Sequence, residues 1–397
     1  MAEERTKTTE DFDLYSDAAT ACPQPVYQAM RESCPVTRSA FGHATVTRHE
    51  DVSAALRDPE TFSSEMDIAV ALGTVRPMIP QQIDPPLQTS FRRLLDPMFS
   101  SKRMAHLDEQ IRDHARRLID DVYEQGECEF DRAFAIPLPC IAFLGLMGLP
   151  QEDLDLFLEL KDGIIRPPFP AEDLEGAMAY RKKTGARIYA TFEKLIDEKI
   201  AHPQDDLMSL LVQAEVDGRP VTREEMLDIS FLLLLGGLDT VTATLGCSIA
   251  HFAQNAEDRQ RILDDPRNIP GAVEELLRWE TPVTNVPRMM KRDVQIGEET
   301  LRAGELVSLQ LGSANTDEAG FENAGEVDLA RKVNRHLAFG AGPHRCLGSH
   351  LARLELRIAF EEWHRRIPHY RIAAGETPRY SPGIREVRYL PLSWDVR

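Results

Sequence analysis

A glycine-rich segment around a single cysteine limits what this chain can fold into more than any other part of its sequence. The segment runs from Phe339 to Gly348 and reads FGAGPHRCLG, and leucine or isoleucine then recurs at residues 347, 351, 354 and 358. This spacing predicts an amphipathic helix over residues 346–366 with Cys346 at its N-terminus, where unpaired N–H groups and the helix dipole favour a thiolate over a thiol. The glycines allow a tight turn, or a large flat group against the backbone.

A cysteine in this position is predicted to be a ligand, and two alternatives stay open. It can be an inert cysteine after a Gly/Pro turn. It can also join a zinc site with His336, His344 and His350, although structural zinc sites usually contain pairs such as Cys-x-x-Cys, which this sequence lacks.

The charge and apolar content of the chain argue against several classes of protein. Its 397 residues carry a net charge of −19, which disfavours nucleic acid or an anionic membrane as a partner. The N-terminal stretch lacks the apolar core of a signal peptide, and the longest apolar run, Ile229 to Leu238, is about half as long as a membrane-spanning helix requires. The six cysteines are scattered, as expected for reduced thiols. We therefore expect a soluble, cytoplasmic protein without disulfides.

Helical periodicity dominates the sequence, and no linker, repeat or low-complexity tract divides it. We expect a single domain over residues 1–397, mainly α-helical with a small β region. Helices are predicted over residues 25–33, 50–56, 86–99, 101–125, the 140s, 152–161, 171–201, 222–253, 270–280 and 346–366. Short strands are predicted over residues 44–47, 294–296, 306–311, 370–372 and 387–392.

The helix predicted over residues 222–253 has a clear start and an irregular middle. Thr222 and Glu225 have the spacing of a capping box, and Val221 with Met226 that of a hydrophobic staple. The segment Gly236-Gly237-Leu238-Asp239-Thr240 then places two poor helix formers and an acid–alcohol pair in an apolar span. Such a break of local rules is typical of a functional site.

The acid–alcohol pair predicts proton delivery beside a locally opened turn of this helix. The Thr240 hydroxyl can hold a hydrogen bond to a bound group while Asp239 passes protons to it from solvent. The alternative is structural: Thr240 bonds its own backbone and Asp239 joins a surface ion pair. Farther along, Glu275 and Arg278 lie one helical turn apart, which by itself predicts an ordinary solvated pair.

These segments together resemble the motifs of the cytochrome P450 family. The cysteine segment matches Phe-x-x-Gly-x-(His/Arg)-x-Cys-x-Gly at every constrained position. Residues 236–240 match (Ala/Gly)-Gly-x-(Asp/Glu)-Thr, and residues 275–278 match Glu-x-x-Arg. The resemblance implies the P450 fold, with haem b between the long central helix and the cysteine-ligand loop.

The resemblance also implies a role for each site residue. Cys346 is the expected iron ligand, Asp239 and Thr240 are the expected catalytic pair, and Glu275 with Arg278 is expected to be a buried structural pair. The other residues expected to contact haem are Gly236, Gly348 and three propionate-binding residues, Arg92, Arg288 and His344. Gln88 stands where many relatives have histidine, so one propionate contact is expected to differ.

Further similarity points to the bacterial camphor monooxygenase branch of the family, on residues 84–86, 234–241, 366–368 and 390–394. The substrate contacts it implies are Arg76, Leu232, Leu235 and Gly236. Arg76 replaces the ketone-binding tyrosine of that branch and Val286 replaces an aspartate near a propionate, which argues against camphor itself. If Arg76 faces the pocket rather than solvent, it favours a substrate with a carboxylate or carbonyl group.

The expected activity is monooxygenation of a small hydrophobic molecule (terpenoid-like, steroid or aromatic acid) with O2 and two electrons. A ferredoxin and its NAD(P)H-dependent reductase are the expected electron source. The predicted docking patch consists of Arg92, Arg93, Lys102, Arg103, Arg345 and Arg353. Two rival functions stay open. A haem-thiolate peroxygenase or rearrangement enzyme would not need the acid–alcohol pair, and a non-catalytic haem-binding sensor would usually carry an output module.

Overall fold

The computed structural model describes residues 12–14, 16–33, 35–38, 43–66, 72–170, 173–381 and 383–396. The chain forms two compact units, each built from separate stretches. Unit 1 comprises Met1–Ser63, Ala115–Ala135 and Thr240–Arg397, and unit 2 comprises Ser64–His114 and Ile136–Asp239. The division falls inside two helices, α6 (Asp108–Tyr123) and α11 (Arg223–Gln254). Neither unit is therefore a continuous stretch that a linker could delimit.

The largest sheet belongs to unit 1 and has the strand order β1-β2-β10-β7-β3. Its strands are β1 (Val36–Arg38), β2 (Ala44–Val46), β3 (Phe62–Ser63), β7 (Val286–Met290) and β10 (Leu306–Leu309). Only the β2–β10 pair is parallel within this sheet. Alternate residues such as Val46, Val307 and Leu309 are fully buried in one core, as the two-residue period of a half-buried strand requires.

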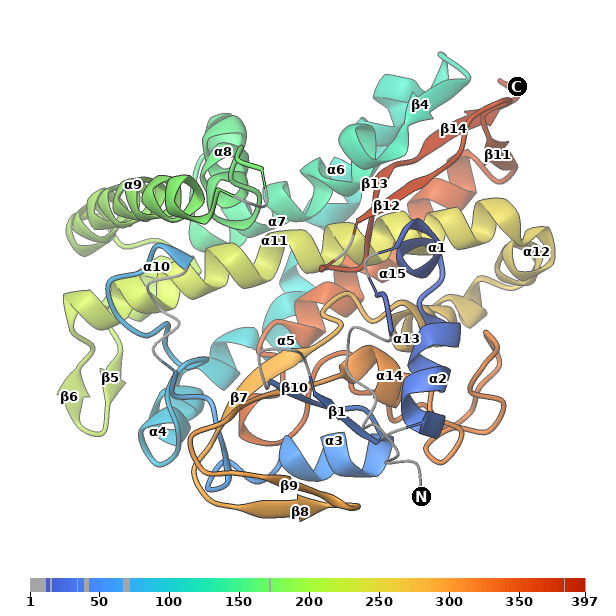
Figure 1. Cartoon of the computed structure of the whole chain (residues 1–397). Helices are drawn as coiled ribbons and strands as arrows, with labels where there is room; N and C mark the ends of the chain where they lie inside the picture. The colour runs from blue at the N-terminus through green and yellow to red at the C-terminus, as the bar shows by residue number, and fades with distance from the viewer. Residues whose placement is uncertain are drawn as a thin grey trace, which may run out of the picture. The chain divides into compact units, whose positions relative to one another are not determined.

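A second sheet of unit 1 brings the C-terminal strands together, in the order β11-β14-β4 (Figure 1). It consists of β4 (Glu127–Glu129), β11 (Tyr370–Ile372) and β14 (Pro391–Trp394). Under it, Trp363 is fully buried against the rings of Phe130, Phe134, Tyr370 and Trp394. Two further hairpins pair β8 (Val294–Ile296) with β9 (Glu299–Leu301), and β12 (Arg379–Ser381) with β13 (Glu386–Tyr389).

Both units contain more helix than strand. Unit 1 contains α1 (Asp17–Ala21), α2 (Gln24–Ser33), α3 (His49–Ala55), α12 (Ala256–Asp264), α13 (Ile269–Glu280), α14 (Leu311–Asn315) and α15 (Ser349–Arg366). Unit 2 contains α4 (Leu87–Leu95), α5 (Ser101–Met104), α7 (Pro137–Met147), α8 (Leu154–Ile165), α9 (Leu174–Ala201), α10 (Leu207–Val212) and the β5 (Glu215–Val216)–β6 (Arg219–Pro220) hairpin. In unit 2, α8 and α9 lie side by side (Figure 1), and Phe157 of α8 contacts Phe192 of α9 at 6.0 Å between ring centroids.

The predicted fold class, mainly α with a small β region, is confirmed, but several boundaries differ. The helix predicted over residues 86–99 ends at Leu95 and continues as a 3-10 turn, Asp96–Phe99, because Pro97 cannot donate an α-helical hydrogen bond. The helix predicted over residues 101–125 consists of α5, a 3-10 turn (Ala105–Leu107) and α6. Residues 171 and 172 of the predicted helix 171–201 lie outside the described residues; α9 begins at Leu174, with Asp173 as its N-cap.

Helix α11 has the predicted start but not the predicted break. The Thr222 N–H donates to Glu225 Oε2 (2.8 Å) and the Glu225 N–H donates to Thr222 Oγ1 (3.2 Å), so the capping box is confirmed. The backbone then continues as α-helix through residues 236–240, and the expectation of a locally opened turn was wrong. Tertiary packing outweighs the low helix propensity of the two glycines. By length and composition α11 could cross a membrane, yet 67% of its most apolar window is buried, as in the core helix of a soluble protein.

Candidate functional site

The cysteine segment forms a tight loop in unit 1. Gly340 and Gly342 have φ angles of 64° and 66°, and a Cβ atom at Gly342 would lie 2.3 Å from the Leu56 carbonyl oxygen. Only glycine fits there without strain. The Cys346 N–H donates to the Phe339 carbonyl at 2.8 Å, which closes the loop and leaves the Cys346 side chain exposed.

Cys346 does not stand at the N-terminus of the following helix, as the sequence predicted. Helix α15 begins at Ser349 with Gly348 as its N-cap, and Arg345 before the cysteine has non-helical backbone angles (φ −53°, ψ 137°). The Cys346 amide is engaged with Phe339, so this residue belongs to the loop and not to the first helical turn. The loop, rather than the helix dipole, presents the thiol.

The zinc alternative finds no support in the geometry. Across the described ranges, no three His, Cys, Asp or Glu side chains gather so that they could hold a metal ion. His336, one member of the supposed zinc set, instead contacts Glu274 through Nε2 at 3.1 Å.

The Glu-x-x-Arg motif lies in α13 of unit 1, and both of its charged side chains are fully buried. Arg278 forms two hydrogen bonds with Glu275, at 2.7 and 3.0 Å, and also donates to the carbonyls of Asn315, Ala324 and Glu326. Arg331 donates to the same carboxylate at 2.9 Å. Burial alone would raise the pKa of Glu275, but these arginines lower it. The pair is a buried structural anchor with a second arginine on the same carboxylate, and not the solvated pair that spacing alone predicts.

Arg331 is a member of this anchor that sequence reasoning missed. It lies 56 residues after Glu275 in a stretch without helix or strand signals, so local patterns give no reason to join the two.

Thr240 opens the unit 1 part of α11 and is half-buried. The Thr244 hydroxyl, one turn later, donates to the Thr240 carbonyl at 2.8 Å. A further turn on, the Ser248 hydroxyl is fully buried. Thr240, Thr244 and Ser248 are spaced four residues apart and so lie on one face of the helix.

Asp239 ends the unit 2 part of α11, where its side chain is only 1% exposed and is held by two cations. Lys161 Nζ lies 2.7 Å from Oδ1, and Arg166 Nη1 lies 3.1 Å from Oδ2. Both cations also contact Asp162, which is 53% exposed, at 2.9 Å. The ion pair of Asp239 is therefore buried, unlike the surface pair considered from sequence, and a continuous set of charged groups joins it to solvent.

Sequence reasoning missed Lys161 and Arg166. A signal existed for Lys161: it follows Phe157 by four residues and precedes Ile164 by three, so it lies on the buried stripe of α8, where a lysine is rarely left without a partner.

Arg76 of unit 2 is bound by a carboxylate of its own chain. Its Nε and Nη2 atoms donate to Asp228 at 2.8 and 3.1 Å, and its guanidinium lies 5.6 Å from the centre of the Tyr189 ring. The Tyr189 hydroxyl donates to the same carboxylate at 3.1 Å. The positive charge that would select an anionic substrate is therefore already matched. Leu232 and Leu235 are half-buried.

The donor set of the described residues fits a haem. Cys346 offers one exposed thiol, and Arg288 of β7 offers a guanidinium that is 3% exposed and donates to the Pro287 carbonyl. A Cβ atom at Gly348, or at Gly236 in unit 2, would meet no atom within 4 Å. His344 lies in a 3-10 turn of the cysteine loop. Within unit 1, a thiol ligand, a buried cation for a propionate and open space beside Gly348 are what a large, flat, dianionic group requires.

Three of the basic residues predicted to bind a ferredoxin are paired with carboxylates of this chain. Arg92 contacts Asp96 at 2.8 Å, Arg103 contacts Asp205 at 3.1 Å, and Arg353 forms a two-bonded pair with Glu274. Arg93, Lys102 and Arg345 are exposed.

Comparison with known proteins agrees with the fit of Cys346 and Arg288 to a haem. The model of the family described as cytochrome P450 matches residues 167–363. A probable cytochrome P450 127A1 from Sinorhizobium fredii is 37% identical over 91% of this chain and 85% of its own length. A steroid C26-monooxygenase from Mycobacterium tuberculosis is 36% identical over 88% of this chain and 87% of its own length. Among solved structures, CYP109E1 from Bacillus megaterium in complex with testosterone superposes with a TM-score of 0.88 at 29% identity, covering 96% of this chain and 100% of that one.

Proposed function

The chain belongs to the cytochrome P450 family, and from that premise we propose that it is a ferredoxin-dependent monooxygenase that hydroxylates an uncharged polycyclic substrate of the steroid or terpenoid class. Members of the family carry haem b, and relatives of this chain include named monooxygenases.

Four residues of unit 1 hold the haem in this proposal. Cys346 supplies the thiolate ligand, Arg288 and His344 bind propionate, and Gly348 lets the backbone lie against the ring. Arg92 of unit 2 is a further propionate ligand by resemblance. When bound, the haem supplies the oxidising chemistry that inserts an oxygen atom into a C–H bond.

The protein controls protons and water around this chemistry. Thr240 presents a hydroxyl from a regular helix, and Asp239 beside it is tied to Lys161 and Arg166. Those cations also contact the exposed Asp162. Lys161 and Arg166 can therefore shift from Asp239 to Asp162, which lets a proton pass from solvent to Asp239 without an open water channel. This device favours monooxygenation over the peroxygenase and rearrangement alternatives, which consume no protons from solvent at this step.

The observation that carries the substrate class is the ion pair of Arg76 with Asp228. Because Asp228 already neutralises the Arg76 guanidinium, an aromatic acid would gain no ion pair from it. A neutral substrate is therefore favoured. The half-buried Leu232 and Leu235 offer apolar contacts to it. The names of a steroid C26-monooxygenase relative and of a testosterone-bound neighbour support the steroid class.

The electron donor is an acidic ferredoxin, reduced by its NAD(P)H-dependent reductase in the cytoplasm. Arg93 and Lys102, both exposed on unit 2, are the residues we expect it to contact.

Titration of the haem-loaded protein with three matched ligand sets tests the substrate class: neutral steroids, neutral terpenoids and hydrophobic aromatic acids. Binding of a substrate beside the haem would shift the Soret band. Saturable shifts with the neutral sets, and at least about tenfold weaker binding of the acids, support the proposal, since a mismatched buried charge costs more than 1.4 kcal/mol. Tighter binding of the acids would overturn it.

A further inference from the structure

Two adjacent glutamates of α13 enter different networks. Glu275 belongs to the structural anchor with Arg278, whereas Glu274 turns toward the cysteine loop. Its carboxylate accepts from Arg353 Nε at 2.6 Å, from Arg353 Nη2 at 2.8 Å and from His336 Nε2 at 3.1 Å. The sequence motif singles out Glu275 only, and nothing in its pattern distinguishes Glu274.

The hydrogen bonds of His336 define its protonation. The Ala338 N–H donates to Nδ1 at 3.2 Å, so Nδ1 accepts and the ring proton resides on Nε2, from which it is donated to Glu274. The ring is thus neutral, and its side chain is 2% exposed. Burial alone would raise the pKa of Glu274, but the hydrogen bonds from Arg353 and His336 lower it. The only two formal charges in this group are those of Glu274 and Arg353, and they balance.

Both partners of Glu274 also contact Phe339, the first residue of the cysteine loop. The Arg353 guanidinium lies 4.4 Å from the centre of the Phe339 ring, and the His336 ring centre lies 5.8 Å from it. The carbonyl of Phe339 accepts the Cys346 N–H at 2.8 Å. Glu274 is therefore two contacts from the loop and three from the cysteine.

We propose that Glu274 is a positioning residue for Cys346: through Arg353 and His336 it clamps Phe339, and Phe339 fixes the loop that presents the thiolate to iron. This inference rests on the proposed role of Cys346 as the iron ligand. Outer contacts of this kind orient a metal ligand and adjust its electron donation.

The network has an electrostatic consequence with a defined sign. Reduction of the iron adds a negative charge, so a nearby positive charge favours the ferrous state. Glu274→Gln leaves the Arg353 charge unbalanced beside the loop and raises the midpoint potential. Arg353→Leu leaves the Glu274 charge and lowers the potential. Loosening of the loop alone would move both variants in one direction.

The experiment measures two properties of the haem-loaded protein: the midpoint potential, and the rate at which the ferrous carbon-monoxide complex loses the red-shifted Soret band of a haem thiolate. The matched control is Glu361→Gln, which breaks the Arg357–Glu361 pair on the same helix. That pair spans 3.0 Å and is 31% and 27% exposed, against 30% and 29% for Arg353 and Glu274. We expect opposite potential shifts in Glu274→Gln and Arg353→Leu, and loss of the band about fivefold faster in both, as for a partly exposed pair worth ~1 kcal/mol. Glu361→Gln should stay within about twofold of the wild type.

Potential shifts of the same sign in Glu274→Gln and Arg353→Leu would overturn the inference. So would equal rates of band loss in Glu274→Gln and Glu361→Gln. In either case a thiolate band in the wild type would leave the proposed function intact. If Glu274→Gln does not fold, Arg353→Lys takes its place in the test. This variant keeps the positive charge, but it loses the two-bonded contact with Glu274 and the planar guanidinium over the Phe339 ring. A near-wild-type potential with faster loss of the band supports the clamp, and wild-type behaviour in both readouts refutes it.

Discussion

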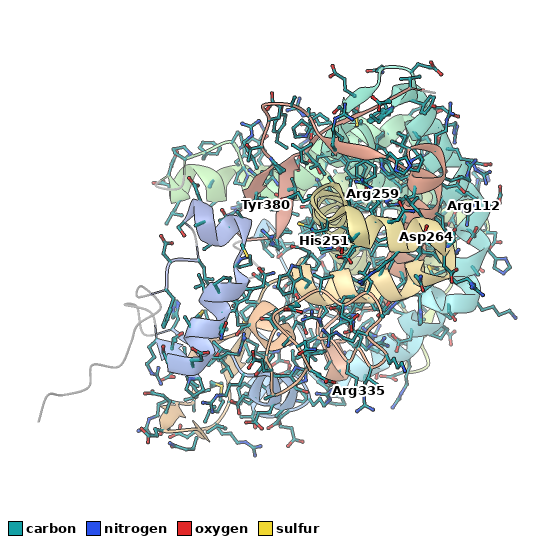
Figure 2. All side chains as sticks on the ribbon, turned by 90° about the vertical axis from the view of Figure 1, so that its right-hand side faces the viewer. Arg112, His251, Arg259, Asp264, Arg335 and Tyr380 are labelled. Atoms are coloured by element: carbon teal, nitrogen blue, oxygen red, sulfur yellow. The ribbon has the colours of Figure 1, made fainter. Side chains whose placement is uncertain are left out.

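Buried His364 of α15 should make the protein lose stability in mild acid. Its Nδ1 lies 2.8 Å from the Phe360 carbonyl, which can only accept, so Nδ1 carries a proton, and its Nε2 lies 3.0 Å from the Tyr370 hydroxyl. Figure 2 labels Arg259 of α12, whose guanidinium lies over the Tyr370 ring at 4.8 Å. Burial lowers the pKa of His364 from 6.5 to about 4, and the charge of Arg259 acts in the same direction.

The sign and size follow from proton linkage. Above pH 6.5 the ring is neutral in both the folded and the unfolded chain, and it contributes no pH dependence. Between pH 6.5 and about 4 only the unfolded chain binds the proton, so stability falls as pH falls. At 1.36 kcal/mol per pH unit, the loss at pH 4.5 is about 2.5 kcal/mol.

Urea unfolding of the wild type and of His364→Gln at pH 7.5, 6.5, 5.5 and 4.5 isolates this contribution. Glutamine can keep one donor and one acceptor but cannot titrate. The free energy of unfolding of the wild type, relative to the variant, should fall by about 2.5 kcal/mol from pH 7.5 to 4.5, because other groups cancel in the difference. His106→Gln, which removes an exposed histidine, is the control. A difference that stays constant with pH would show that His364 does not take up a proton on unfolding.

Three further predictions concern turnover. Thr240→Ala should keep substrate binding and electron consumption while product falls and hydrogen peroxide rises, which product and peroxide assays can measure; unchanged coupling would show that another hydroxyl or water suffices. Asp239→Asn should slow turnover and also destabilise the protein by about 2 kcal/mol in urea unfolding, because Lys161 stays buried with Asp162 as its remaining partner; full stability would contradict the buried pair. Electron transfer from an acidic ferredoxin should slow as salt is added, and charge reversal at Arg93 and Lys102 should slow it further at low salt; rates that are flat with ionic strength would count against that docking site.

The parts of the site that the sequence predicted are those in which local pattern and chemistry coincide. The capping box at Thr222 depends on neighbouring residues only, and the positive φ angles of Gly340 and Gly342 are local to the turn before Cys346, so spacing was enough to predict both features. The start of the helix after Cys346 was placed three residues too early, since a hydrogen bond to Phe339 commits the cysteine backbone to the loop. Periodicity carries no information about that contact.

The partners of the charged residues could not be predicted, because they come from distant stretches. Lys161 and Arg166 meet Asp239 from 78 and 73 residues away, and Asp228 meets Arg76 from 152 residues away. Each of these contacts changes the function assigned to its residue. Asp239 becomes part of a charged route to solvent, and Arg76 loses its reason to bind an acid. The camphor branch stays a prediction from sequence.

Spectra of the reduced, carbon-monoxide-bound wild type and of Cys346→Ala decide whether Cys346 is the thiolate ligand of a haem. We predict that the wild type shows the red-shifted Soret band of haem thiolates and that the variant lacks it, because the other described cysteines, Cys22, Cys128, Cys140 and Cys247, lie outside the loop. A variant that kept the band would show that another cysteine is the ligand, and a wild type without it would contradict the assignment.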